Sequence, residues 1–345
     1  MNNPKKYKIS AIGILISGVC IYLALWKIDV EGTLHAFKKP NYWFLLPAIM
    51  VLFFSHFLRT LRWRYLLDPI KRMDILTLFS PLMIGYAVNT FMPAHLGEFS
   101  RAYVLSKRGQ LPLAQIAATI VIERVIDVFS LLVLMLLVFR IYRFPEWVAK
   151  SGYIMFAGSA GLLILLMFLK ITTSATMKFM HFILKPLPKT FNREIESTLL
   201  KFLSGITPLK RWHDYITMSV LSVIMWLSYC AVFYFCLHAF NFMEMYGLNW
   251  SVSLVLLVIT SIAIVVPSSP GYVGTYHYLC QISLIMFGVP ADSALTFAVV
   301  VHGVTFIPVF VAGLFFVHRE GMSLLKMSKH GFGSREDMPV TTGES

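Results

Sequence analysis

The sequence has few charged residues. Charged side chains make up only 14% of the 345 residues, while 57% are apolar and the mean hydropathy is +0.72. Soluble domains average about 25% charged residues, so this shortage excludes a soluble fold and predicts an integral membrane protein. Acidic residues are the scarcer kind, with 17 Asp and Glu against 30 Lys and Arg. Because the basic residues fall in short loops between apolar runs, we expect contact with anionic inner-leaflet lipids and not with nucleic acid.

Cysteine is also scarce, and the common enzyme signatures are missing. The four cysteines lie in or beside apolar segments without the spacing of metal ligands, so core packing is their expected role. There is no H-E-x-x-H motif, no nucleotide-binding P-loop and no paired-cysteine metal site. We therefore expect a protein that is not an enzyme, with no catalytic residue, no metal and no cofactor.

A cleavable signal peptide is absent as well. Lys5, Lys6 and Lys8 precede an apolar run without a small-residue cleavage site, which predicts an uncleaved first span. Further apolar runs of about 20 residues predict five more spans. The six predicted spans cover about 9–26, 42–58, 113–139, 152–170, 214–240 and 292–317.

Two more apolar stretches, 75–92 and 250–266, end in breaks where a proline is followed four residues later by a glycine. Proline removes a backbone donor and glycine frees the backbone, so both residues interrupt helices. A second short helical segment follows each break, at 97–107 and 275–288, which is typical of a re-entrant hairpin. Broken helices in matching places of two halves indicate a transporter's substrate site. We expect the moving gates at Asn89, Pro93, Gly97, Pro267, Pro270, Gly271 and Gly274.

The distribution of Lys and Arg fits this layout. With a cytoplasmic N-terminus and two re-entrant hairpins, 22 basic residues fall inside and six outside, which satisfies the positive-inside rule. The inside group includes Arg59 and Arg62, which follow the predicted second span and are assigned to a cytoplasmic loop. Each half then crosses three times, so the second half is inverted relative to the first. The predicted fold is an all-α membrane protein with about six transmembrane helices, two re-entrant helical hairpins and an inverted 3+3 repeat. Eight simple spans with proline kinks are the alternative.

The same layout divides the chain into two repeats and a tail. The first repeat is 1–140, with its hairpin at 75–108. The second is 141–318, with a cytoplasmic amphipathic segment at 171–213 and a hairpin at 250–289. Within that segment 192–206 fits an amphipathic helix best, and the polar tail 319–345 is expected to be cytoplasmic and disordered. Both termini lie in the cytoplasm of a multi-pass inner-membrane protein.

Five ionisable residues remain within the predicted membrane layer. Charges there cost at least about 2.5 kcal/mol each on insertion scales, so they are candidates for function. Helical spacing places Glu98 with Arg101, and Asp127 with both Glu123 and Arg124. Three acids and two bases leave one negative charge, which a proton can neutralise, more readily once a lipid phosphate has joined the group. Ion pairs that only fix helix packing are the structural alternative.

Several neutral side chains near the breaks could contact a headgroup. Backbone N–H groups that start the half-helices after Pro93 and Pro267 would add positive dipole ends. Ordinary capping of broken helices explains the serines and asparagine equally well, and histidines in membranes commonly serve packing. The candidate headgroup contacts are His95, Ser268, Ser269, Tyr272, Thr275 and His277.

The two breaks and the charged residues carry a family resemblance. Asn89-Thr-Phe-Met-Pro-Ala-His-Leu-Gly-Glu-Phe-Ser-Arg-Ala-Tyr103, Glu123-Arg-Val-Ile-Asp127 and Pro267-Ser-Ser-Pro-Gly-Tyr-Val-Gly-Thr275 resemble the flippase-like family named for the transmembrane region of lysylphosphatidylglycerol synthase. That protein is also called the multiple peptide resistance factor, and hopanoid-associated and archaeal dolichol-pathway relatives share the family. The resemblance covers about 8–318 and implies movement of an amphiphilic lipid. The large synthases add a soluble aminoacyl-transferase domain, so synthase activity is not expected of this chain.

Residues and resemblance together predict a flippase for an anionic phospholipid or a polyprenyl-phosphate-linked lipid or glycan. Arg101 and Arg124 are expected to bind the lipid phosphate, while Glu98, Glu123 and Asp127 hold the arginines and could shuttle a proton. One alternative is a membrane-embedded lipid-modifying transferase or hydrolase with Glu98 or Asp127 as general base. Another is a non-catalytic scaffold of an envelope-synthesis complex. The sequence is compatible with a homo-oligomer and does not name the lipid.

Overall fold

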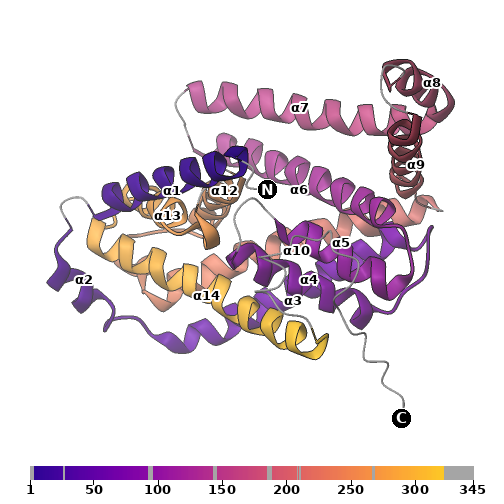
Figure 1. The fold of residues 1–345 in the computed structure, drawn as a ribbon. Helices are drawn as coiled ribbons and strands as arrows, with labels where there is room; N and C mark the ends of the chain where they lie inside the picture. Colours follow the sequence, from indigo (N-terminus) through magenta and orange to yellow (C-terminus); the bar gives the residue numbers. More distant parts are fainter. Residues whose placement is uncertain are drawn as a thin grey trace, which may run out of the picture. The chain divides into compact units, whose positions relative to one another are not determined.

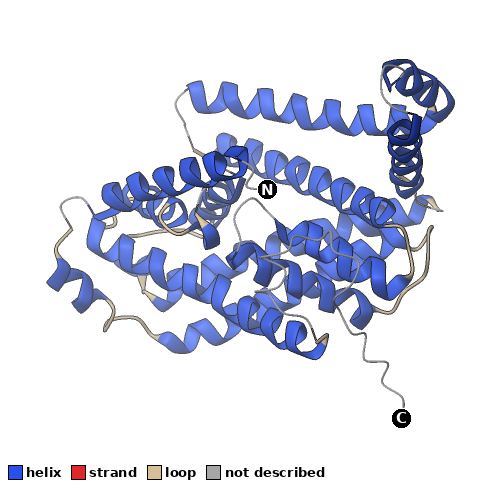
Figure 2. Cartoon of the chain, in the orientation of Figure 1, coloured by secondary structure: helices blue, strands red, loops and turns tan. Residues whose placement is uncertain are grey.

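The computed structural model describes residues 4–25, 28–91, 96–142, 146–184, 189–207, 209, 211–265 and 269–321. These residues form fourteen α-helices and two short 3-10 helices, and no strand occurs among them (Figure 2). The predicted all-α class is confirmed for this part of the chain. Residues 319–321, which were predicted to begin a disordered tail, form the end of a helix and a turn. The rest of the predicted tail lies outside the described residues.

The helices follow one another along the chain with short connections (Figure 1). In the first part they are α1 Pro4–Leu25, α2 Val30–Ala36, η1 Tyr42–Phe44, α3 Leu45–Leu67, α4 Ile75–Phe91, α5 Leu96–Gly109 and α6 Leu113–Ile141. In the second part they are α7 Glu146–Ile171, α8 Thr173–Leu184, α9 Lys189–Gly205, α10 Trp212–Ala239, α11 Phe242–Met245, α12 Ser251–Val265, η2 Pro270–Tyr272, α13 Thr275–Ile285 and α14 Ala291–Arg319.

Every predicted span and half-helix coincides with a helix of the structure. The two interrupted segments are α4 followed by α5, and α12 followed by η2 and α13. The predicted amphipathic helix 192–206 is α9. The largest difference is at α3, which continues nine residues past the predicted end at 58 because no proline or glycine interrupts it before Pro69.

Three helices are long and apolar enough to cross a membrane among the described residues: Tyr42–Leu67, Trp212–Ala239 and Ala291–Arg319. A fourth candidate joins Ala160–Ile171 to Thr173–His181 across a bend of 89°. α6 is long enough too, but it carries three charges near its middle and is not among them. The prediction of a multi-pass membrane protein is therefore supported.

The chain divides into two compact units, which we describe separately. Unit 1 comprises 1–58, 82–100 and 223–345, and unit 2 comprises 59–81 and 101–222. Both units are discontinuous in sequence because α3, α4, α5 and α10 each contribute to both. The predicted division into sequential repeats, with a boundary at 140, stays a prediction.

In unit 1, α13 is the central helix and packs against α1, α12 and α14. Phe240, Phe242 and Phe297 form an aromatic cluster with ring centroids 5.2 to 5.6 Å apart. Gly313 of α14 faces the backbone of Met83 and the side chain of Ala87 so closely that a Cβ atom would overlap both. Close approach of this kind lets helices associate without large side chains between them.

In unit 2, α6 packs against α7 and α9. Gly205 at the end of α9 lies against the backbone of Gln115, where a Cβ atom would not fit. A small core of buried side chains joins the three helices, and it consists of Ala118, Val125, Leu166, Leu203 and Ile206. α9 is therefore anchored on α6, the helix that carries the predicted charged residues.

Candidate functional site

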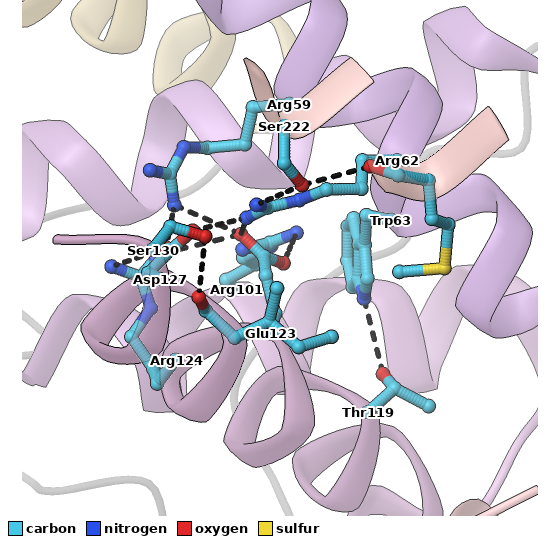
Figure 3. A network of polar contacts seen from close by, with 12 residues as sticks. Arg59, Arg62, Trp63, Arg101, Thr119, Glu123, Arg124, Asp127, Ser130 and Ser222 are labelled. Carbon is cyan, nitrogen blue, oxygen red and sulfur yellow. Dashed lines mark hydrogen bonds and ion pairs between the residues drawn. The ribbon is translucent and has the colours of Figure 1, made fainter. Parts of the chain in front are cut away.

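Six charged side chains of unit 2 form one network, buried except at Arg124, which we call the arginine cluster. α3 supplies two arginines, α5 supplies one, and α6 supplies an arginine and both carboxylates. In Figure 3 the guanidinium groups converge on the two carboxylates. The arginine cluster consists of Arg59, Arg62, Arg101, Glu123, Arg124 and Asp127.

Glu123 is the most enclosed carboxylate, with a fully buried side chain. Arg59 Nη1 donates to its Oε1 at 3.0 Å, and Arg101 Nη2 donates to its Oε2 at 2.7 Å. Arg124 Nη2 lies 3.4 Å from Oε1. Each oxygen of Glu123 is thus satisfied by a charged donor, which is the condition for a carboxylate to remain ionised in a buried place.

Asp127 joins the two arginines of α3. Arg59 Nη1 donates to its Oδ2 at 2.7 Å, Arg62 Nη2 hydrogen-bonds its Oδ1, and Arg124 Nη1 lies 3.7 Å from Oδ2. Arg62 also donates through Nη1 to Ser222 Oγ of α10 at 3.2 Å. Asp127 therefore connects α6 with α3, and Arg62 extends the network to α10.

A tryptophan supports the cluster from one side. The Arg101 guanidinium lies over the Trp63 ring, 3.5 Å from its centroid, and Trp63 Nε1 donates to Thr119 Oγ1 at 3.0 Å. Thr119, Glu123 and Asp127 follow one another at four-residue spacing and so share one face of α6. This contact fixes the plane of the guanidinium, because arginine stacks favourably on aromatic faces.

The charge balance of the cluster corrects the expectation from sequence. Four arginines face two carboxylates, so the cluster is positive, whereas the sequence predicted one excess negative charge. Even if Glu98 is counted, arginines outnumber acids by four to three. Only Arg124 has a substantially exposed side chain, at 38%, while the other members are at or below 10%. Arg124 is therefore the accessible cation.

Arg59 and Arg62 were predicted to lie in a cytoplasmic loop, and the structure corrects this prediction. Both are buried, at 5% and 0% exposure, within α3. Removing them from the inside count leaves 20 basic residues against six, so the charge asymmetry remains. Their i, i+3 spacing beside Trp63, in a helix with no breaker before Pro69, was the available signal.

At the first break, the Asn89 side chain of α4 bonds the first turn of α5 within unit 1. Its Oδ1 accepts from the Gly97 backbone N–H at 2.7 Å, and its Nδ2 lies 3.4 Å from Glu98 Oε2. A Cβ atom at Gly97 would overlap the Gly85 carbonyl and the Asn89 side chain. Asn89 thus caps the first turn of α5, and Pro93 and His95 lie outside the described residues.

The second break is held by neutral hydrogen bonds within unit 1. The Ser269 backbone N–H donates to Ser17 Oγ of α1 at 2.8 Å, and the Gly274 N–H donates to His277 Nδ1 at 3.2 Å. His302 Nε2 of α14 lies 2.8 Å from the Gly271 carbonyl oxygen. Gly271 has φ +67° and Gly274 has φ +92°, conformations that favour glycine.

The other residues predicted at this break lie close to it. Pro270 begins η2, Tyr272 ends it with φ +60°, and Thr275 begins α13 and donates from Oγ1 to the Tyr272 carbonyl at 3.2 Å. Pro267 and Ser268 lie outside the described residues. The structure therefore brings Arg101, Glu123, Arg124 and Asp127 together in unit 2. The predicted residues of the two breaks that the structure describes lie in unit 1, where hydrogen bonds stabilise the interrupted segments themselves.

Comparison with known proteins identifies a family and two relatives that resemble this chain. The model of a protein family described as the lysylphosphatidylglycerol synthase TM region matches residues 10–313. A UPF0104 membrane protein of Methanocaldococcus jannaschii is 23% identical over 184 residues, which are 51% of this chain and 55% of the relative. A UPF0104 membrane protein of Methanothermobacter thermautotrophicus is 29% identical over 129 residues, 36% of this chain and 38% of the relative. The matched region spans about half of the first relative and less of the second.

Proposed function

The chain belongs to the lysylphosphatidylglycerol synthase TM region family, and from that premise we propose that it is a lipid flippase. It moves an anionic phospholipid or a polyprenyl-phosphate-linked lipid across the cytoplasmic membrane. The observation that carries this proposal is the surplus of arginines over carboxylates in the buried arginine cluster. A lipid phosphate is the anion that a membrane supplies to such a cluster.

Electrostatics favours phosphate as the missing counter-charge. Four arginines share two carboxylates, so the cluster has a net positive charge, and a phosphate accepts two parallel hydrogen bonds from a guanidinium. Arg124 has the most exposed side chain of the cluster and receives the phosphate first. Arg101 binds Oε2 of Glu123, whereas Arg124 contacts Oε1 of the same carboxylate. Glu123 and Asp127 act as positioning residues, because each of them binds at least two arginines.

The positive cluster also limits how a proton could be coupled to transport. Without bound lipid, the net positive charge of the cluster opposes protonation of Glu123 and Asp127. The excess negative charge from which the sequence predicted protonation is not present in the cluster. Bound lipid phosphate lowers the positive potential at Glu123 and Asp127, and proton uptake is then less unfavourable. We therefore assign any proton coupling to the lipid-bound state.

We propose the membrane layout that the sequence predicted: six spans, two re-entrant hairpins, an inverted 3+3 repeat and both termini in the cytoplasm. Support comes from the two interrupted segments, α4 with α5 and α12 with α13, at corresponding places of the two halves. Inverted repeats of transporters place such broken helices at the substrate site. The hairpins at 75–108 and 250–289 serve as the gates.

We further propose that the protein moves its lipid without changing it chemically. A general base needs a carboxylate that can reach a substrate proton. Here both oxygens of Glu123 and both oxygens of Asp127 are engaged by arginines. That arrangement favours anion binding over acid–base catalysis and supports a transporter over a transferase or hydrolase.

The test is a sidedness assay in proteoliposomes with head-labelled phospholipids and polyprenyl phosphates. We expect wild-type protein to make inner-leaflet label accessible for one anionic lipid class, and mass spectrometry to recover that lipid intact. Protein-free liposomes and a zwitterionic lipid serve as controls. Recovery of a modified lipid would replace the flippase by an enzyme, and folded protein that moves none of these lipids would contradict the proposal.

A further inference from the structure

The second break of unit 1 contains two histidines in contact. His277 lies in the first turn of α13 and His302 lies in α14, and their ring centroids are 4.6 Å apart. Both side chains are half-buried. Ionisable side chains within a membrane layer are rare and often mark a path for protons or substrate, so this pair is a candidate for a function of its own.

The hydrogen bonds of the break determine which nitrogen of each ring carries a proton. The Gly274 backbone N–H can only donate, so His277 Nδ1, 3.2 Å away, accepts and carries no proton. The Gly271 carbonyl oxygen can only accept, so His302 Nε2, 2.8 Å away, donates. The two rings therefore respond differently to acid. His302 can gain a proton at Nδ1 and keep its bond, whereas His277 can gain a proton at Nδ1 only by giving up its bond to Gly274.

The bond between His277 and Gly274 holds the turn where it touches α1. Gly274 has φ +92°, and a Cβ atom there would lie 2.5 Å from the Ser17 carbonyl oxygen of α1. His277 is the third residue of α13, the position from which a Glu or Gln side chain reaches back to the backbone N–H that precedes a helix. Histidine differs from glutamine at this position because protonation removes its acceptor nitrogen.

The helices around His277 bring no carboxylate close to it. α1 faces the break with Ser17 and Ile21, and α12 carries no titratable side chain. The only carboxylate within the bounds of α1, α12, α13 and α14 is Asp292, about 15 Å along α14 from His302. A proton on His277 therefore has no counter-charge beside it, and a protonated His302 repels it. The titratable groups around the two rings are those of Tyr276 and Cys280 of α13 and Cys236 of α10.

We propose that His277 Nδ1 is a proton-binding site that controls the second break. While the ring is neutral, Nδ1 accepts from Gly274 and holds the turn against α1. A proton taken from water at Nδ1 turns the acceptor into a donor, so the Gly274 N–H is released and the imidazolium turns to water or an anion. Loss of that proton restores the bond.

This proton site is separate from the carboxylates of the arginine cluster. Under the layout proposed above, the released segment belongs to the hairpin 250–289, so acid acts on that gate. The bond between His277 and Gly274 is present when the ring is neutral and is lost as the pH falls. The site itself needs no lipid, so it can be tested independently of lipid transport.

The test is hydrogen–deuterium exchange of the full chain in detergent, with overlapping peptides across 269–277 that resolve the Gly274 amide. Protection is the intrinsic exchange rate divided by the observed rate, which removes the effect of pH on the exchange chemistry. Between about pH 7.5 and pH 4.5 we expect wild-type protection of this amide to fall about fivefold, because one hydrogen bond is lost. Protection of α10, the reference for an intact fold, should change less than about twofold. Wild-type protection of Gly274 that does not change with pH would overturn the proposal.

His277→Gln is the matched variant, because glutamine at this position accepts from the same N–H but does not titrate. We expect its protection of Gly274 to vary less than about twofold over the same pH range. The same pH dependence in His277→Gln and wild type would overturn the proposal.

His302→Phe keeps the test decisive if His277→Gln does not fold. Because His302 keeps its bond to Gly271 when it is protonated, this substitution should lower protection at both pH values and preserve the wild-type fall of about fivefold. Loss of the pH dependence in folded His302→Phe would assign the proton to His302 and overturn the proposal. No lipid is added in these measurements, so their failure leaves the flippase to be judged by its own assay.

Discussion

The arginine cluster of unit 2 and the second break of unit 1 are both polar places in an apolar chain, but they are built differently. In the arginine cluster, charged side chains bind one another, and arginines are in surplus. At the second break, neutral groups bind the backbone: Ser17 accepts from Ser269, His277 accepts from Gly274, and His302 contacts Gly271.

This difference indicates that the second break and the arginine cluster have separate roles. The neutral bonds at the second break satisfy backbone groups that the interrupted helix exposes, and any alternative in the membrane would leave them without partners. The arginine cluster satisfies its carboxylates and still has positive charge left over. The break is therefore suited to holding a bent backbone, and the cluster is suited to receiving an anion.

The largest expected effect tests the charged side of the comparison. Glu123→Gln removes the carboxylate that Arg59 and Arg101 share, and with it one of the two negative charges that face the four arginines. We expect a loss of about 3–5 kcal/mol in the free energy of unfolding, measured by denaturant titration in detergent. Glu194→Gln, on the exposed face of α9, should change stability little. A stability close to wild type would show that the cluster does not need Glu123.

A steric change tests the first break. Gly97→Ala would place a methyl group into the Gly85 carbonyl and the Asn89 side chain, and should cost about 1–3 kcal/mol of unfolding free energy. Gly158→Ala on α7 is the control, because nothing lies within 4 Å of its added Cβ. Ala is the better helix former, so the control should be neutral or slightly stabilising. Equal effects of both substitutions would refute the close approach at Gly97.

The smallest effect concerns the neutral side of the comparison. His302→Phe keeps the aromatic contact with Phe306 but removes the hydrogen bond to the Gly271 carbonyl, and should cost about 1–2 kcal/mol. His318→Phe, near the end of α14, should leave stability almost unchanged. Because the His302 contact is to a backbone carbonyl, the loss should not depend on added lipid. A lipid-dependent loss would assign His302 to ligand binding.

The sequence predicts the helices well because apolar runs of this length have few other solutions in a membrane. It also identifies Glu123, Arg124 and Asp127, which share one helix, and Arg101. It did not place Arg59 and Arg62 in the site, because the predicted span ended at 58, directly before the first arginine, whereas α3 continues to Leu67. Contacts between distant residues, such as Ser17 with Ser269, leave no local pattern that one sequence could reveal.

Lipid translocation by Arg124→Gln, compared with Arg140→Gln on the same helix, tests the central claim most directly. Arg124 is the exposed member of the cluster, and Arg140 is an exposed arginine outside it. Both proteins would be reconstituted in liposomes with the lipid that wild type moves, and the rate of label exposure compared. We predict that Arg124→Gln lowers the rate at least about tenfold while Arg140→Gln stays within about twofold of wild type. Equal rates for wild type and folded Arg124→Gln would contradict a role of the arginine cluster in binding the lipid phosphate.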